Sequence, residues 1–369
     1  MKVVNPVLFV LALGLVGSSG QLIAQTASAG LEGGVPLITG EAEEEEEKST
    51  FEISGFVDAY YAWSSIDQAL PTSFTESVNS FNLGMANVVF SKEGKVGFVA
   101  DLAVGPRAEV ANGFNGTTLA AIKQLYVTYS PSDWLTFTFG NYSTHVGYEV
   151  IDAPANVNYS TSYMFSNGPF YHTGLKADIA LSDQFGLMLG VFDDTDSKLD
   201  FTPGKHFGAQ LSYAGEALEV YLNYIGGQDQ AESLIDPSIR GHQFDITATY
   251  QATEKLGFGL NATTKTNVIE EADNTTWSGA ALYTNYAIND GFTLGGRAEF
   301  ISDQDGLIMG ALDGNVTSFT LSANFFEGPL TFIPEFRIDT SSDDVFLSGD
   351  GNAESSNALF ILGLVYSFE

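Results

Sequence analysis

The sequence predicts an all-β fold: a transmembrane, antiparallel, up-and-down β-barrel of about 16 strands, with about 14 to 18 strands open as alternatives. Three observations lead to this prediction. From Phe51 onward, apolar and polar residues alternate with the period of two that sends successive side chains to opposite faces of a strand. Tight turns alternate with long acidic loops along the same stretch. The chain also ends in a strand with one continuous apolar face.

The last strand shows the pattern most clearly. Its apolar face consists of Phe360, Leu362, Leu364, Tyr366 and Phe368. In a water-soluble protein, an apolar strand at the chain end would leave an edge that promotes aggregation. A closed barrel pairs that edge and turns the apolar face toward lipid. Earlier segments alternate in the same way over about nine to twelve residues, enough for a tilted strand to cross the hydrocarbon layer.

A soluble β-sandwich is the main alternative, because it also alternates apolar and polar residues. The polar face of a sandwich would be exposed and rich in charge. Here that face carries mostly Gly, Ser, Thr, Asn, Gln and Tyr, whereas most charged residues fall in the loops. After the N-terminus, the sequence has no run of about 18 apolar residues that would form a membrane-spanning helix. The pattern therefore favours strands closed on themselves in a membrane.

The N-terminus has the pattern of a secretory signal peptide, which we place at residues 1–24. An early lysine is followed by a short apolar core and then by small residues. Cleavage after Ala24 and cleavage after Ala29 both fit this pattern. Residues 25–50 contain an acidic run without apolar periodicity, and we expect them to form a disordered leader. The predicted barrel then occupies residues 51–369.

The charge balance is strongly acidic, with 46 Asp and Glu residues against 14 Lys and Arg residues and a net charge of −32. Such a surface repels nucleic acid, so no nucleic-acid partner is expected. Two causes of the acidity stay open: an interior that attracts cations, or adaptation of the surface to a salty medium. The absence of cysteine excludes a disulfide framework and a lipoprotein anchor. The four histidines lack metal-ligand spacing, and we expect neither a metal nor another cofactor.

A few charged residues occupy the polar parity of the predicted strands and would line the interior of the barrel. Arg297 and Glu299 lie two residues apart, and Glu335, Arg337 and Asp339 follow the same spacing. Opposite charges on one inner face suggest a transverse field that orders ions and water in a pore. Internal salt bridges that stiffen the wall are the alternative, and the two are compatible. The complete predicted lining is Asp58, Asp101, Lys176, Asp178, Asp245, Arg297, Glu299, Glu335, Arg337 and Asp339.

The connector from Asn141 to Pro169 is long and rich in Asn, Ser, Tyr and Gly. Loops of this length inside a compact fold commonly have a function. Folded into the barrel, the connector would narrow the channel with hydrogen-bonding groups from Glu149, Asn156, Asn158 and Tyr159. A surface loop without a role in transport is the alternative.

Short motifs stand out in and around this connector: Gly140-Asn-Tyr-Ser-Thr-His-Val-Gly147-Tyr-Glu149, Asn158-Tyr-Ser160-Thr-Ser162, Gly168-Pro169 and Thr173-Gly174. Together with the opening strand Ser54-Gly-Phe-Val-Asp-Ala-Tyr-Tyr61 and the aromatic last strand, they resemble the OmpL-like β-barrel porin family. The resemblance implies a porin in the outer membrane of a Gram-negative bacterium, surrounded by outer-membrane lipid. It also implies assembly through periplasmic chaperones and the barrel assembly machinery, and it supplies no catalytic residues. Outer-membrane proteins usually end on an aromatic residue, whereas Glu369 follows the last aromatic residue here.

The sequence thus leads to two functional hypotheses. The first is a porin that admits small hydrophilic solutes or ions by passive diffusion, with a modest cation preference, as a monomer or a homotrimer. The alternative is a plugged barrel that binds a partner or a matrix through acidic extracellular loops. A lipid-hydrolysing barrel would need a histidine at the position of Met164, before Ser166-Asn167-Gly168, so no enzymatic activity is expected. Strand number separates the two hypotheses, because about 16 strands enclose an aqueous channel and much smaller barrels fill with side chains.

Overall fold

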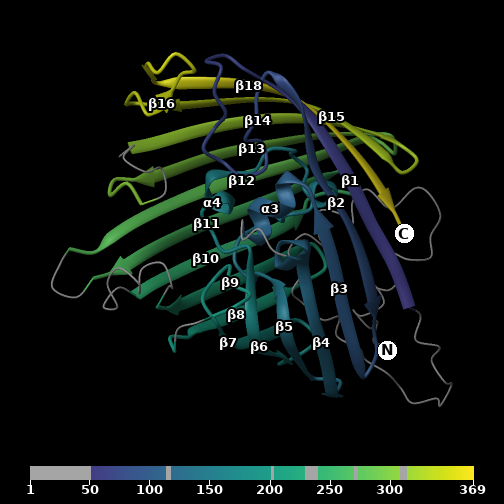
Figure 1. The fold of residues 1–369 in the computed structure, drawn as a ribbon. Coiled ribbons are helices and arrows are strands. Elements are labelled where there is room, and N and C mark those ends of the chain that lie inside the picture. The colour runs from purple at the N-terminus through teal and green to yellow at the C-terminus, as the bar shows by residue number, and fades with distance from the viewer. Residues whose placement is uncertain (1–50, 114–117, 201–202, 229–239, 270–272, 308–313) are drawn as a thin grey trace.

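The computed structural model describes residues 51–113, 118–200, 203–228, 240–269, 273–307 and 314–369. Within these residues, sixteen strands form one closed antiparallel barrel, which confirms the predicted fold (Figure 1). The predicted signal peptide (1–24) and acidic leader (25–50) lie outside the described residues, and both stay predictions.

The strands of the barrel lie beside one another in the order of the sequence. They are β1 (Phe51–Ser64), β2 (Ser80–Lys92), β3 (Val96–Val104), β4 (Ile122–Ser132), β5 (Leu135–Ser143), β6 (Tyr171–Ala180), β7 (Phe185–Phe192), β8 (His206–Ala214), β9 (Leu218–Gly227), β10 (Arg240–Gln251), β11 (Leu256–Val268), β12 (Thr275–Asn289), β13 (Phe292–Asp303), β14 (Gly314–Glu327), β15 (Leu330–Ser341) and β18 (Ser356–Phe368). The remaining elements are a hairpin of β16 (Phe346–Leu347) and β17 (Ala353–Glu354), the helices α3 (Pro106–Asn112) and α4 (Tyr163–Ser166), and the 3-10 turns η3 (Thr118–Ala121) and η4 (Ala153–Ala155). None of the described helices is long and apolar enough to cross a membrane.

The first and last strands close the barrel by pairing with each other. Their antiparallel register joins residues 55–64 to residues 359–368. Along β18, Phe360 and Leu364 are exposed, whereas the intervening Ile361 is fully buried. The apolar face predicted for the chain end therefore points outward. Closure leaves the barrel without an unpaired edge, and the exposed apolar side chains form the surface that meets lipid.

The two ends of the barrel differ in their connections. Short turns join the strands at one end, where β18 also finishes, and longer segments join them at the other (Figure 1). We call these the turn end and the loop end. In bacterial outer-membrane barrels, short turns lie on the periplasmic side and long loops on the extracellular side. The alternation predicted from the sequence is therefore present.

Three segments from the loop end fold into the barrel. They are residues 65–79, helix α3 with the residues around it, and the segment between β5 and β6 that contains α4; Figure 1 shows both helices within the ring of strands. Apolar side chains of these segments, including Phe74 and Phe165, pack together in the interior. Val345 and Phe346 of the β16 region join the same cluster from the loop end. The interior therefore contains a hydrophobic core as well as a polar wall.

The connector predicted from Asn141 to Pro169 has different bounds in the structure. Strand β5 continues through Ser143, which pairs with Tyr171 at the start of β6. The polar composition of residues 141–143 suggests a loop, but hydrogen bonding to β6 extends the strand over them. The connecting segment is therefore 144–170, and we call it the inner loop.

Candidate functional site: the loop inside the barrel

The inner loop crosses the interior and contacts strands on several sides. Just after β5, the ring of His145 donates from Nε2 to a backbone carbonyl of β9 at 3.0 Å, and the amide of Gly147 donates to Asp245 at 3.1 Å. Farther along, the side-chain amide of Asn158 donates to Ser322 of β14 at 2.6 Å. The loop is thus held by strands on separate parts of the wall.

Two glutamates on the wall hold the inner loop by its backbone. Glu335 of β15 accepts hydrogen bonds from the amides of residues 159–160, at 2.7 and 3.0 Å. Glu299 of β13 accepts from the amides of residues 163–164, at 3.1 and 3.0 Å. Both carboxylates are buried, and hydrogen bonds to an ionised acceptor are among the strong ones. Each glutamate therefore fixes one turn of the loop backbone.

Two arginines on the same strands complete this arrangement. Arg297 forms an ion pair with Glu149 and donates to a carbonyl of the inner loop at 2.7 Å. Arg337 donates to the carbonyl of Thr161 at 2.7 Å and lies 2.9 Å from Asp339. Both guanidinium groups are buried. A buried charge is tolerated when it is paired and hydrogen-bonded, which is the case here. We call Arg297, Glu299, Glu335 and Arg337 the clamp.

A second polar group joins the inner loop to β1 and α3. Tyr159 donates from its hydroxyl to Asp58, and the guanidinium of Arg107 lies 3.6 Å from the same carboxylate. Arg107 also donates to the carbonyl of Ile151 at 3.1 Å and lies over the rings of Phe74 and Tyr159, at 4.7 and 5.2 Å. Burial raises the pKa of Tyr159 well above its usual value, so the hydroxyl stays a donor.

Sequence reasoning missed Lys123, which ties the inner loop to the β3 and β4 wall. Its ammonium lies 2.8 Å from Asp101 and 2.6 Å from Asp152. The register of β4 against β3 passes from Gln124 to Ile122 and leaves Lys123 without an opposite residue. Such a bulge re-aims a side chain, whereas strict alternation places Lys123 on the lipid side. Arg107 was missed as well, because nothing in the sequence marks its loop as folded inward.

Inward-facing glycines make room for side chains of the inner loop. A Cβ added at Gly363 of β18 would lie 2.5 Å from the ring of Tyr159, and one at Gly295 of β13 would lie 2.5 Å from Val157. The same relation joins Gly208 to His145, Gly259 to Tyr148 and Gly279 to Met164. We call these five glycines the sockets. They allow the loop to pack directly against the backbone of the wall.

Near the turn end, the wall formed by β6 to β9 also carries charged residues, but these are bonded differently from those of the clamp. Lys176 lies 3.3 Å from Asp178, and Glu219 accepts a hydrogen bond from Tyr221 at 3.4 Å. Asp178 and Glu219 are only partly buried. Among the described hydrogen bonds and ion pairs, none joins either carboxylate to the inner loop. We call Lys176, Asp178, Glu219 and Tyr221 the open wall.

The ten charged residues predicted to line the interior all lie on inward-facing positions of their strands. Most of them contact the inner loop or another wall residue, as described above. Of the four predicted loop residues, Glu149, Asn158 and Tyr159 contact strand side chains. Asn156 instead bonds within the loop, donating to the carbonyl of Val150 at 2.7 Å. The structure thus brings Glu149 to Arg297 and Tyr159 to Asp58, and the role of these residues in lining a pore stays a prediction.

Histidines on separate segments of the sequence meet where the inner loop leaves β5. The rings of His145 and His172 lie 5.2 Å apart, and His172 stacks on Phe192 at 4.6 Å. Burial lowers the pKa of His145 to about 4, so its ring is neutral at pH 7. Within the described residues, no group of three His, Asp or Glu side chains is arranged to hold a metal ion.

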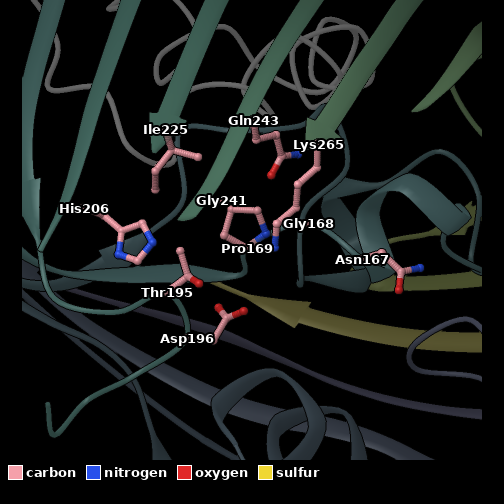
Figure 2. Close-up of a pocket in the computed structure, with 10 residues that line it drawn as sticks. All are labelled: Asn167, Gly168, Pro169, Thr195, Asp196, His206, Ile225, Gly241, Gln243 and Lys265. Atoms are coloured by element: carbon pink, nitrogen blue, oxygen red, sulfur yellow. The ribbon is translucent and has the colours of Figure 1, made fainter. Parts of the chain in front are cut away.

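A small cavity of about 110 Å³ lies at the loop end, where the inner loop returns to β6 (Figure 2). Side chains from the wall and from the segment between β7 and β8 surround it. The lining residues are Asn167, Gly168, Pro169, Thr195, Asp196, His206, Ile225, Gly241, Gln243 and Lys265. The sequence did not indicate this site, because its residues come from six separate parts of the chain.

Comparisons with known proteins agree with this architecture. The family described as "Putative beta-barrel porin-2, OmpL-like" matches residues 50–368. None of the curated proteins matches the sequence. Similar solved structures include an anion-selective porin from Comamonas acidovorans, with 10% identity, coverage of 87% of this chain and 100% of that chain, and a TM-score of 0.57. The outer-membrane channel DcaP of Acinetobacter baumannii has 13% identity, coverage of 89% and 100%, and a TM-score of 0.57. The trimer form of OmpT from Vibrio cholerae has 12% identity, coverage of 87% and 99%, and a TM-score of 0.57.

Proposed function

The chain belongs to the OmpL-like β-barrel porin family and is a porin of the bacterial outer membrane, and on this premise we propose that it passes small hydrophilic solutes and ions by passive diffusion, with a modest preference for cations. The inner loop carries the proposal. A barrel of about 16 strands is wide enough for an aqueous channel. A loop fixed across its interior narrows that channel. The predicted role of Glu149, Asn156, Asn158 and Tyr159 as a constriction is part of this proposal.

The cation preference rests on carboxylates that no described ion pair neutralises. Asp245 is buried and accepts hydrogen bonds from the amides of Asn223 and Asn261, at 2.8 and 2.6 Å. Glu219 on the open wall accepts only from a tyrosine hydroxyl among the described contacts. Carboxylates in a narrow polar passage raise the local concentration of cations. The Comamonas porin is anion-selective, but an identity of 10% relates the two chains in fold alone.

The assembly state and the assembly route extend the proposal. Because one similar structure is a trimer form, a homotrimer is the assembly to test first, by crosslinking the refolded protein in detergent. Export through periplasmic chaperones and the barrel assembly machinery follows from an outer-membrane location and remains part of the same proposal.

Single-channel conductance in a planar bilayer under a salt gradient tests the transport proposal. The full chain is compared with a variant in which a short Gly-Ser linker replaces residues 145–168. We expect stable current steps with a cation-biased reversal potential, and larger steps from the variant. A reversal potential of zero would refute the cation preference. Absence of current from both correctly folded proteins would refute the porin.

One observation favours the plugged barrel as a second candidate: the inner loop is held at several sides of the wall. If the loop closes the passage, only the variant without residues 145–168 conducts, and the full chain stays silent. That result would favour the alternative function, in which the protein binds a partner through its acidic loops. The same recordings therefore separate the two candidates.

A further inference from the structure

A second, smaller cavity lies on the same stretch of wall as the cavity at the loop end, and both are lined by residues of β8, β9 and β10. The cavity at the loop end reaches Ile225 and Gln243, which are paired across β9 and β10. The second cavity, of about 30 Å³, reaches Tyr221 and Thr247, a pair nearer the turn end of the same two strands. The two cavities therefore follow one another along this wall.

The inner loop separates the two cavities at the level that lies between them. At that level Asp245 of β10 accepts a hydrogen bond at its Oδ1 from the amide of Gly147, at 3.1 Å. Gln210 of β8 donates to the carbonyl of His145 at 3.2 Å. We call residues 145–147 the crossbar. Hydrogen bonds attach the crossbar to the wall, so it can leave the wall without any change in the barrel.

The interior under β13, β15 and β18 offers no comparable route. Buried apolar side chains of these strands, including Ile301, Ile333 and Ile361, belong to the hydrophobic cluster formed with the segments that fold in from the loop end. The clamp joins β13 and β15 to the inner loop. On β9, by contrast, the partly buried Glu219 follows the second cavity toward the turn end. A passage for solutes therefore fits best along β8, β9 and β10.

Asp245 places a negative charge at the crossbar. Its buried carboxylate accepts hydrogen bonds from the amides of Gly147, Asn223 and Asn261, at 3.1, 2.8 and 2.6 Å. Within the described residues, no ion pair includes Asp245. Hydrogen bonds from amides stabilise the charged form of a carboxylate without cancelling its charge. When the crossbar leaves the wall, one of these donors is lost, and a single negative charge faces the passage.

We propose that Asp245 determines the selectivity of a passage along β8, β9 and β10, and that a small monovalent cation takes the place of the Gly147 amide at its carboxylate when the crossbar leaves the wall. This movement joins the two cavities. The cation compensates the single charge of Asp245, whereas an anion is repelled by it. The crossbar is thus the gate of the passage, and Asp245 is its specificity-determining residue. This inference rests on the proposed porin function.

Single-channel recording of D245N under a salt gradient tests the role of the charge. The ratio of cation to anion permeability should fall about tenfold, the effect of one hydrogen-bonded charge contact. The fraction of time in the conducting state should rise, because a neutral acceptor holds the Gly147 amide less strongly than an ionised one. D183N, at the exposed β6–β7 turn, should change neither quantity. A wild-type permeability ratio in D245N would overturn the selectivity role, and a wild-type open fraction would overturn the gate.

Cysteine substitution tests the route without relying on current, since the sequence contains no cysteine. Thr247 lines the second cavity, whereas Ser318 is buried on β14. In the refolded full chain, aminoethyl methanethiosulfonate, a small cation, should modify T247C much faster than S318C. It should also react faster at T247C than the anionic sulfonatoethyl reagent. Mass spectrometry measures the rates, and heat-modified migration in gels verifies that each variant is folded.

Two double variants separate the effect of Asp245 from that of overall acidity. The preference of T247C for the cationic reagent should persist with D183N and fall with D245N. Equal preferences in the two double variants would overturn the role of Asp245. Equal rates at T247C and S318C would overturn the route.

The outcomes also distinguish this inference from the proposed porin. If the full chain conducts but D245N keeps the wild-type selectivity, the porin stands and its selectivity is set elsewhere. If T247C shows a preference that depends on Asp245 but neither the full chain nor the 145–168 variant conducts, the cation site stands and the transport proposal fails.

Discussion

The clamp and the open wall lie in one barrel but use their charges in different ways. On the clamp, buried side chains such as Arg297 and Glu335 bond to the backbone or the side chains of the inner loop. On the open wall, Glu219 is partly buried, and no described hydrogen bond or ion pair joins it to that loop. A charge that already has a protein partner is compensated and attracts ions weakly. Under the proposed porin function, we expect the clamp to position the constriction and the open wall to set the field that ions experience.

Breaking the clamp should have the largest effect. R297M removes the ion pair of Glu149 and leaves that carboxylate buried without its cation. Loss of one partner of a buried pair costs about 3 to 5 kcal/mol, so the inner loop should spend much more time detached. Protease cleavage within residues 144–170 should accelerate, and single-channel current should become larger and noisier.

R240M is the matched control, because Arg240 is exposed at the start of β10. It should leave cleavage and current unchanged. If R297M behaves like R240M, the clamp does not hold the loop and the contrast between the two walls is lost.

Acidification is expected to weaken another attachment of the inner loop, at His145. The pKa of this ring falls from about 6.5 to about 4, first because of burial and then because of nearby positive charge on Lys176. The unfolded segment therefore binds a proton more readily than the docked one below pH 6.5. Docking is most stable above pH 6.5 and loses about 3 kcal/mol as the pH falls to 4.

Recordings between pH 7 and pH 4 measure this loss, because current noise should increase as the inner loop detaches. The increase should disappear in H145Q, which cannot take up the proton. H242Q serves as the control, because His242 bonds to Tyr224 away from the inner loop. An identical increase in the wild type and in H145Q would exclude His145 as the responsible group.

Filling a socket should have an intermediate effect. In G363A, the new methyl group would lie 2.5 Å from the Tyr159 ring, and overpacking of this kind costs about 1 to 3 kcal/mol. The loop should be displaced locally while the barrel stays closed. Fluorescence of a probe attached near Asn156 would report the displacement. G291A, at a turn where the nearest atom lies 3.6 Å from the added group, should produce none.

The smallest change is expected on the open wall. E219Q removes a partly exposed carboxylate, whose contribution is about 0 to 1 kcal/mol. The ratio of cation to anion permeability should therefore fall by no more than about fivefold, with the step size unchanged. E216Q, in the exposed β8–β9 turn, is the control. A fall of the same size in both variants would mean that overall acidity, rather than the open wall, determines selectivity.

Much of the fold could be predicted because the information is local. Period-two alternation places Asp58 and Arg337 inward from their immediate neighbours alone. Their partners could not be predicted in the same way, since Arg297 and Glu149 are 148 residues apart and meet only when the barrel closes. Lys123 does not follow the parity rule, because a bulge reverses the direction of its side chain. The transverse field suggested for the charged strands stays a prediction, since ion pairs account for part of the same residues.

The contacts of Tyr159 have a consequence for how the barrel forms. Asp58 and Gly363 lie on β1 and β18, the two strands that meet last in the closed ring, and Tyr159 touches both. Contacts between residues so distant in the chain form late and slowly in folding. The inner loop thus links β1 to β18 from inside the barrel, so pairing of these two strands and docking of the inner loop should occur in a single step. Substitutions at Tyr159 would then appear first as delayed assembly, before any change in the finished channel.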